Sequence, residues 1–139
     1  MIGLNSVTTV NLVATRDSAP FDPKYVMIRS HAAPLGRQLG NRASPTNGIF
    51  NLGGNTAADD VPVSPAHAEL YVDNGQVFVR DSGSKYGTWV DGQRVQRPTL
   101  LKDGSILALG VPIQRSAETP ASVTDDFLKP IVAEVTIVQ

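Results

Sequence analysis

Short apolar runs recur along the chain, and several of them alternate polar with apolar side chains. This alternation has a period of two residues, which is typical of strands with one buried face. Strands are therefore expected at residues 7–14, 25–29, 61–63, 68–72, 77–80, 88–90, 105–109 and 131–138. Turn formers separate many of these runs, at Asp73-Asn74-Gly75, Asp91-Gly92, Asp103-Gly104 and Ser18-Ala19-Pro20. Strands at this spacing predict an all-β sandwich.

Two connections are longer than the others. Residues 38–60 are rich in turn formers and hold one small apolar island, Ile49, Phe50 and Leu52. A loop of this length is either functional or a disordered insertion, and both interpretations stay open. The second connection, residues 116–130, carries Pro120 and Pro130 and receives no function. Within it, residues 122–129 are expected to form a surface excursion and not a helical turn.

The composition fits one compact domain. With 139 residues, 41% hydrophobic and 6% aromatic, the chain has enough apolar content for a single core. The 12 basic and 13 acidic residues leave a formal charge of -1, so nothing indicates a surface for nucleic acid or an anionic membrane. No apolar run approaches the roughly 20 residues that cross a bilayer, and the N-terminus lacks the pattern of a signal peptide.

Cysteine is absent, which excludes disulfides and fits a cytosolic or nuclear setting. We therefore expect a cytoplasmic location. The chain ends directly after an apolar run and begins a few residues before its first one. We interpret residues 1–139 as a single domain cut from a longer protein.

No pattern in the sequence favours an enzyme. The histidines are limited to His31 and His67, and neither a glycine-rich phosphate loop before a helix nor a metal-ligand spacing is present. The carboxylate pairs Asp59-Asp60 and Asp125-Asp126 are interpreted as solvated loop faces. We expect no catalytic residue, no cofactor and no metal site.

Three donors in separate loops suit a phosphate group. A phosphothreonine carries a charge between -1 and -2 and three acceptor oxygens, so its site needs fixed donors. Arg37 follows Gly36, which allows a sharp turn at a strand end and presents the side chain at a rim. Ser64 follows the apolar run 61–63, and Lys85 lies in a turn before Gly87. On spacing alone, these three remain ordinary surface residues as an alternative.

Three motifs together resemble the forkhead-associated (FHA) domain. They are Leu35-Gly36-Arg37, Ser64-Pro65-Ala66-His67-Ala68, and the run from Asp81-Ser82-Gly83 to Val90-Asp91-Gly92. The resemblance covers residues 7–137 and implies an eleven-stranded β-sandwich whose loops bind phosphothreonine peptides. The order of the run at residues 20–28, the Leu35-Gly36-Arg37 motif, a long loop and the run at residues 106–113 resembles the FHA domains of the sarcolemma membrane-associated and fungal factor-arrest proteins. That similarity implies an adaptor of a striatin-interacting phosphatase and kinase complex, anchored to a membrane through segments absent here.

The resemblance also implies roles for individual residues. Arg37 becomes the principal phosphate ligand, Ser64 donates to the phosphate, and Lys85 contacts it from the next loop, with Tyr86 beside it. Gly36, His67 and Gly87 become structural residues of the binding loops. His67 braces these loops through backbone hydrogen bonds and takes no part in catalysis, and Trp89 occupies a hydrophobic position.

Two departures from the family pattern bear on function. Pro65 replaces a basic residue that has a backbone N–H, and Tyr86 replaces the asparagine that holds the peptide backbone. Asp91 also departs, but Asp-Gly suits a tight turn. Two hypotheses follow. The domain binds a threonine-phosphorylated partner, or it is a degenerate scaffold for an unphosphorylated partner or for dimerisation. The scaffold would present an apolar patch of Tyr86, Ile49 and Phe50.

Overall fold

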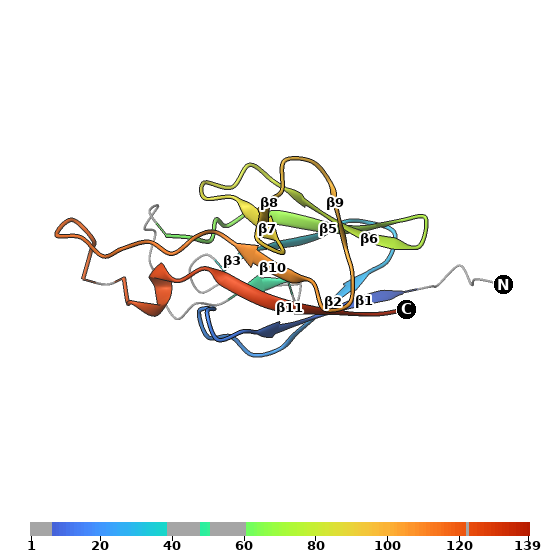
Figure 1. Ribbon diagram of the computed structural model, residues 1–139, viewed down its shortest axis with the longest axis horizontal. Coiled ribbons are helices and arrows are strands. Elements are labelled where there is room, and N and C mark those ends of the chain that lie inside the picture. The colour runs from blue at the N-terminus through green and yellow to red at the C-terminus, as the bar shows by residue number, and fades with distance from the viewer. Residues whose placement is uncertain (1–6, 39–47, 51–60, 122) are drawn as a thin grey trace.

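Two β-sheets form a sandwich in the computed structural model, which describes residues 7–38, 48–50, 61–121 and 123–139 (Figure 1). The six-stranded sheet has the order β2-β1-β11-β10-β7-β8. Its strands are β1 (Thr8–Ala14), β2 (Lys24–Ile28), β7 (Thr88–Val90), β8 (Gln93–Arg94), β10 (Ile106–Leu109) and β11 (Ile131–Val138). The described residues thus confirm the predicted all-β sandwich.

The second sheet has five strands in the order β4-β3-β5-β6-β9. They are β3 (Ala33–Arg37), β4 (Ile49–Phe50), β5 (Ala68–Asp73), β6 (Gln76–Asp81) and β9 (Thr99–Leu101). All of its pairings are antiparallel except β3 with β4, which is parallel. With the first sheet this makes eleven strands in the described part of the chain, the number that the resemblance implies.

Alternating side chains from both sheets meet in one core. Along β1 the even-numbered positions Val10 and Leu12 are buried, while Val13 on the other face is exposed. This is the pattern expected of a strand with one buried face. The largest fully buried apolar side chains of the core come from both sheets and are Leu12, Leu35, Phe50, Leu70, Leu101, Leu107, Leu109 and Ile131.

Tight turns lie where the Asn-Gly and Asp-Gly pairs predict them. Asn74 and Gly75 join β5 to β6 with φ values of 54° and 78°, and Asp91 and Gly92 join β7 to β8 with 50° and 84°. Two successive positive φ values match the hand of a twisted hairpin. The second turn places Arg94 opposite Trp89.

One predicted strand, at residues 61–63, is wrong. Val61, Pro62 and Val63 are buried but form no strand. Pro62 has no N–H to give to a neighbouring strand, and the carbonyl oxygen of Val63 accepts a hydrogen bond from the Arg37 side chain instead. The segment therefore packs beneath the rim as irregular structure.

The long connection after Arg37 contains a strand, contrary to the prediction of an irregular loop. Ile49 and Phe50 form β4, which pairs with Gly36 and Arg37 of β3. Phe50 is fully buried and meets Phe21 edge to face, with ring centroids 4.9 Å apart. Leu52, the third residue of the predicted apolar island, lies outside the described residues, as do the other positions of residues 39–47 and 51–60.

The connection before β11 also carries structure that the sequence analysis missed. Residues 126–128 form a short 3₁₀ helix, η1 (Asp126–Leu128), in which Phe127 and Leu128 are buried. The expectation of a surface excursion without a helical turn is therefore wrong. Val61, Val123, Phe127 and Leu128, with Ile113 beside them, form a second apolar cluster separate from the main core. In Figure 1 the connection between β10 and β11, the projecting segment, extends beyond the ends of the sheets, away from both chain termini.

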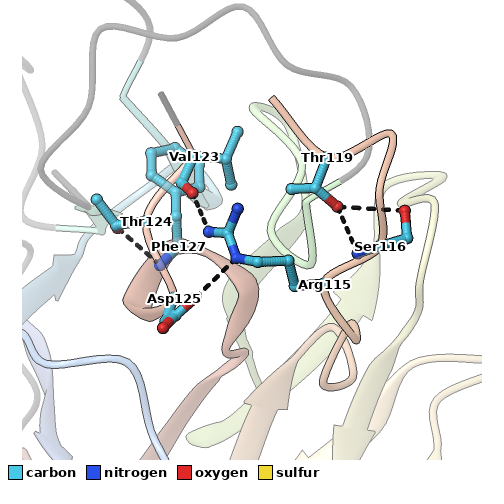
Figure 2. Close-up of polar contacts among 7 residues, drawn as sticks. All are labelled: Arg115, Ser116, Thr119, Val123, Thr124, Asp125 and Phe127. Carbon is cyan, nitrogen blue, oxygen red and sulfur yellow. Dashed lines mark hydrogen bonds and ion pairs between the residues drawn. The ribbon is translucent and has the colours of Figure 1, made fainter. Parts of the chain in front are cut away.

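Polar contacts close this projecting segment on itself (Figure 2). Arg115 donates from Nε to Asp125 over 2.9 Å and from its terminal nitrogen to the carbonyl oxygen of Val123. The Ser116 N–H donates to the Thr119 hydroxyl over 2.9 Å. The Arg115 side chain thus joins the two arms of the segment, and Val123 and Phe127 belong to the apolar cluster that includes Val61.

The helical content of the described residues is limited to η1, and it falls far short of the length and apolar character of a membrane-crossing helix.

Candidate functional site

Three loops meet at one rim and are tied to one another by hydrogen bonds. The Arg37 N–H, at the end of β3, donates to the carbonyl oxygen of Ser64 over 3.1 Å. The Ser64 hydroxyl accepts from the N–H of Lys85 over 3.2 Å. The three residues that the sequence suggested as phosphate donors are therefore neighbours in space, although up to 48 positions separate them in the chain.

Gly36 allows the first two loops to approach each other. A Cβ atom built on Gly36 would lie 1.9 Å from the carbonyl oxygen of Pro65 and 3.1 Å from that of Ser64. Both neighbours are backbone atoms, so neither can turn aside as a flexible side chain would. Any residue larger than glycine at this position would force the Arg37 and Ser64 loops apart.

Arg37 is buried, whereas the sequence analysis expected it to stand at the rim. Only 5% of its surface is exposed, although its backbone lies at the rim as expected. Its Nε donates to the carbonyl oxygen of Val63 over 2.9 Å, and its guanidinium carbon lies 6.0 Å from the centre of the Phe127 ring. A cation over an aromatic face is attracted by the ring quadrupole. The guanidinium is thus fixed by the segment before the Ser64 loop and by η1.

His67 holds the rim together from within. Its side chain is fully buried, its Nδ1 accepts from the N–H of Ser64 over 3.0 Å, and its Nε2 lies 2.8 Å from the carbonyl oxygen of Gly87. A carbonyl only accepts, so Nε2 carries the proton and donates it. Desolvation by burial lowers the pKa of His67, and it outweighs the opposing effects of the Gly87 carbonyl and of Asp81. The imidazole is therefore neutral and fixed in one tautomer.

Asp81 shapes the third loop. Its carboxylate accepts from the N–H groups of Gly83 and Ser84, each over 2.9 Å, and from the hydroxyls of Ser84 and Thr88. Burial alone would raise the pKa of Asp81, but these hydrogen bonds outweigh it and lower the pKa. Asp81 is therefore ionised and engaged with the donors of its own loop, which bring Lys85 into place.

Cations gather at the outer end of this loop. The Lys85 ammonium lies 5.5 Å from the centre of the Tyr86 ring. Arg94, which the sequence analysis did not single out, lies 5.8 Å from the centre of the Trp89 ring. Its guanidinium also covers Gly87, because a Cβ atom there would lie 3.0 to 3.3 Å from three of its atoms. The Asp91-Gly92 turn in the sequence could have indicated this position of Arg94, because a two-residue hairpin turn there sets Arg94 opposite Trp89.

The residues that depart from the family pattern do not form the apolar patch that was expected. Pro65 is exposed and Tyr86 is half-buried. Phe50 is fully enclosed in the core against Phe21, so it cannot extend a surface patch with Tyr86. The predicted surface patch of Tyr86, Ile49 and Phe50 is therefore wrong, because Phe50 does not reach the surface.

Histidine, aspartate and glutamate side chains nowhere gather into a group of three that could hold a metal ion, as far as the described part of the chain extends. The arrangement at the rim consists of hydrogen-bond donors and cations, which suits the binding of an anion.

The buried imidazole makes stability depend on pH. The unfolded chain binds a proton at His67 near pH 6.5, whereas the folded domain binds it only at lower pH. The contribution of His67 to the free energy of unfolding is therefore fully present above about pH 6.5. It decreases as the pH drops below that value, by at most about 1.4 kcal/mol per pH unit. Asp81 does not contribute to the decline between pH 6.5 and 5. Its lowered pKa stabilises the folded domain, and this stabilisation is lost only as the pH falls below about 3.9.

Urea unfolding of the wild type, His67→Gln and His31→Gln between pH 7.5 and 5 measures this dependence. His31 is exposed and serves as the matched control. We expect His67→Gln to be less stable at pH 7.5 and to lose the wild-type decline toward pH 5, and His31→Gln to keep it. A decline of equal size in all three proteins would contradict the role assigned to His67.

The FHA domain family model matches residues 36–110, which is more than half of the chain. A comparison with curated proteins finds no match. Among solved structures, the yeast Pml1 splicing factor is similar with a TM-score of 0.54 and 16% identity, over 100% of this chain and 85% of that one. A second structure, full-length yeast Pml1p, gives 0.53 and 17%, over 95% and 82%.

An FHA domain studied for its phosphothreonine-dependent interactions is similar with a TM-score of 0.51 and 18% identity, over 96% of this chain and 97% of that one. At these identities the solved structures support the fold. The family match covers the rim from Gly36 to the strand that follows Lys85, and it ends at Gly110 just before the projecting segment. The chain belongs to the FHA domain family.

Proposed function

We propose that this domain binds a phosphothreonine segment of a partner protein at the rim formed by Arg37, Ser64 and Lys85. The observation that carries the proposal is the pair of hydrogen bonds through Ser64, which bring the three residues together. A phosphothreonine presents three acceptor oxygens and up to two negative charges. The rim offers it an exposed ammonium and a hydroxyl, with the guanidinium of Arg37 buried beside them, while Asp81 accepts hydrogen bonds from its own loop.

Binding at this site is weaker than a rim with the usual family residues would give. Pro65 contributes neither a positive charge nor an N–H, and the Tyr86 side chain replaces an amide that both donates and accepts. Each charge-assisted hydrogen bond contributes about 1.5 to 3 kcal/mol, so two lost contacts lower the affinity by about two to four decades. The Lys85 ammonium offsets part of that loss, and the contacts expected of Arg37 and Ser64 are retained.

The cellular role that we propose is that of a non-enzymatic adaptor in signalling. Support comes from the sequence resemblance to the sarcolemma membrane-associated and fungal factor-arrest adaptors, which implies a striatin-interacting phosphatase and kinase complex as the context. In that role the domain acts in the cytoplasm and contributes recognition alone. A partner phosphorylated on threonine by such a complex would be held through this rim.

Point substitutions at the rim separate its charge from its hydrogen bonds. We expect Ser64→Ala to lower the affinity for a phosphothreonine peptide about 10- to 100-fold, because a hydrogen bond to a charged group is lost. Lys85→Gln should lower it only about 2- to 5-fold and weaken its dependence on salt, since exposed charges are screened. Isothermal titration of a phosphothreonine peptide library and its unphosphorylated twin, at two salt concentrations, measures both effects.

Lys102→Gln is the matched control for Lys85→Gln, because Lys102 is equally exposed but lies before β10 in the Leu101–Ser105 turn. Its affinity should equal that of the wild type. Equal binding of the phosphorylated and unphosphorylated libraries by the wild type would contradict the proposal.

Restoring the usual family residues tests the account of the weakened rim. Pro65 and Tyr86 both reach solvent, so the double change Pro65→Arg with Tyr86→Asn should be tolerated by the fold. It returns a charged donor and an amide to the site, and we expect phosphopeptide affinity to rise by at least tenfold. The same titration with the double variant measures the gain. An unchanged affinity with an intact fold would show that the departures are not what limits binding.

A second candidate function, a phosphate-independent interaction surface, is favoured by one observation. Among the described residues, four large apolar side chains are exposed: Val13, Tyr25, Met27 and Val138. They belong to three adjacent strands, β2, β1 and β11, and Thr9 pairs with both Met27 and Val138 across the sheet. Contiguous exposed apolar groups mark interaction surfaces in many proteins. This face would serve for dimerisation of the domain.

Sedimentation velocity over a range of protein concentrations tests this second function. A dimer formed through the face should dissociate in Met27→Glu, because a buried carboxylate without a partner opposes association. Gln93→Glu adds the same charge at the exposed β8 edge of the same sheet and should leave the dimer intact. A wild-type domain that remains monomeric at all concentrations would rule out dimerisation as the use of this face.

A further inference from the structure

The guanidinium of Arg37 is engaged on several sides at once. Nε is committed to the carbonyl oxygen of Val63, and the terminal nitrogen Nη1 is shielded from solvent. Phe127 lies on the guanidinium with a separation of 6.0 Å. An arginine binds a phosphate best when two parallel N–H groups face two oxygens. In this arrangement the fork of Arg37 is not open to a bidentate contact.

The aromatic side chain at the Arg37 guanidinium, Phe127, belongs to the segment beyond the family match. Phe127 is 2% exposed and packs with Val61, Val123 and Leu128 in the second apolar cluster. Val61 lies two residues before Val63, whose carbonyl oxygen accepts from Arg37. Residues 123–128, which we term the cover, therefore rest on the same short stretch of chain that holds the arginine.

Within the described part of the chain, polar contacts join both ends of the cover to residues 113–115. Arg115 reaches across the segment to Val123 and Asp125 at the start of the cover (Figure 2). The Ile113 N–H donates to the carbonyl oxygen of Leu128 over 3.0 Å at its other end. The Asp125 side chain is 85% exposed, so its ion pair with Arg115 contributes little in water. A contact of this kind can open without unfolding the sandwich.

We infer that the cover is a regulatory element of the phosphate site: its apolar residues keep Phe127 at Arg37, and the latch from Arg115 to Val123 and Asp125 adds a small increment that favours this closed state over an open one with Arg37 exposed. The inference rests on the proposed phosphothreonine binding and deepens it. A ligand that binds the guanidinium fork must move Phe127 away from it, so the energy needed to open the cover reduces the apparent affinity of the ligand. Weakening the latch should therefore increase both the exposure of Arg37 and the affinity for phosphate.

Two acidic neighbours in the cover provide a matched pair of variants. Asp125→Asn replaces the ion pair with Arg115 by a neutral hydrogen bond at most, whereas Asp126→Asn removes the ion pair with Lys129 and leaves the latch intact. Both changes remove one negative charge from η1 or its first flanking residue. Arg115→Gln removes both latch contacts. Thermal unfolding identifies any variant that is not folded, and Asp125→Asn, at an exposed position, keeps the test valid if Arg115→Gln is lost.

Opening of the cover is measured without any phosphopeptide. One readout is hydrogen exchange at the Ile113 amide, whose acceptor is in the cover. The other is the rate of phenylglyoxal modification of Arg37, located by mass spectrometry. We expect Asp125→Asn to raise both rates about 2- to 5-fold and Arg115→Gln about 10-fold or more, with Asp126→Asn equal to the wild type. Unchanged rates in both latch variants would overturn the inference.

Titration with the phosphothreonine peptide library then separates this inference from the proposed function. Affinity that rises in both latch variants by the same factors as the exposure of Arg37 supports both. An exposed Arg37 with no phosphate-dependent binding in any variant supports the latch and contradicts the proposed function. Phosphate-dependent binding that is equal in the wild type and both latch variants supports the function and overturns the regulatory role of the cover.

Discussion

The buried imidazole of His67 is the interaction on which the rim depends. It fixes the Ser64 loop through Nδ1 and the Gly87 loop through Nε2. The carbonyl oxygen of Gly87 also accepts from the N–H of Gly110, so the same point is joined to the end of β10. Ser64 in turn anchors the backbones of Arg37 and Lys85. One neutral histidine thereby fixes three loops that carry all of the candidate phosphate donors.

Arg37 has two tasks that compete for the same atoms. Its hydrogen bond to Val63 and its contact with Phe127 stabilise irregular segments that have no strand ladder of their own. A phosphate ligand needs the same guanidinium, facing solvent and free to make parallel hydrogen bonds. In this chain the segment after β10 places the Phe127 ring 6.0 Å from the guanidinium carbon of Arg37. The affinity of the site is consequently tied to the stability of that segment.

Local patterns in the sequence predicted much of the fold and the identity of the rim residues, because alternation and Asn-Gly or Asp-Gly turns act over a few positions. The full extent of strand β3 was not predicted, because Pro34 and Gly36 interrupt its alternating pattern. The sheet tolerates both residues because the strand ends at the rim. The burial of Arg37 could not be predicted in this way. It depends on Phe127, 90 positions away, and on a carbonyl oxygen in a segment with no regular structure.

The central claim is that one rim, built by Arg37, Ser64 and Lys85 around His67, receives a phosphothreonine. The most direct test is a ¹⁵N–¹H correlation spectrum of the domain titrated with a phosphothreonine peptide and with its unphosphorylated twin. We expect the phosphorylated peptide alone to shift the amide signals of Arg37, Ser64 and Lys85, together with the Arg37 Nε–H. Shifts confined to β2, β1 and β11, or identical shifts with both peptides, would contradict it.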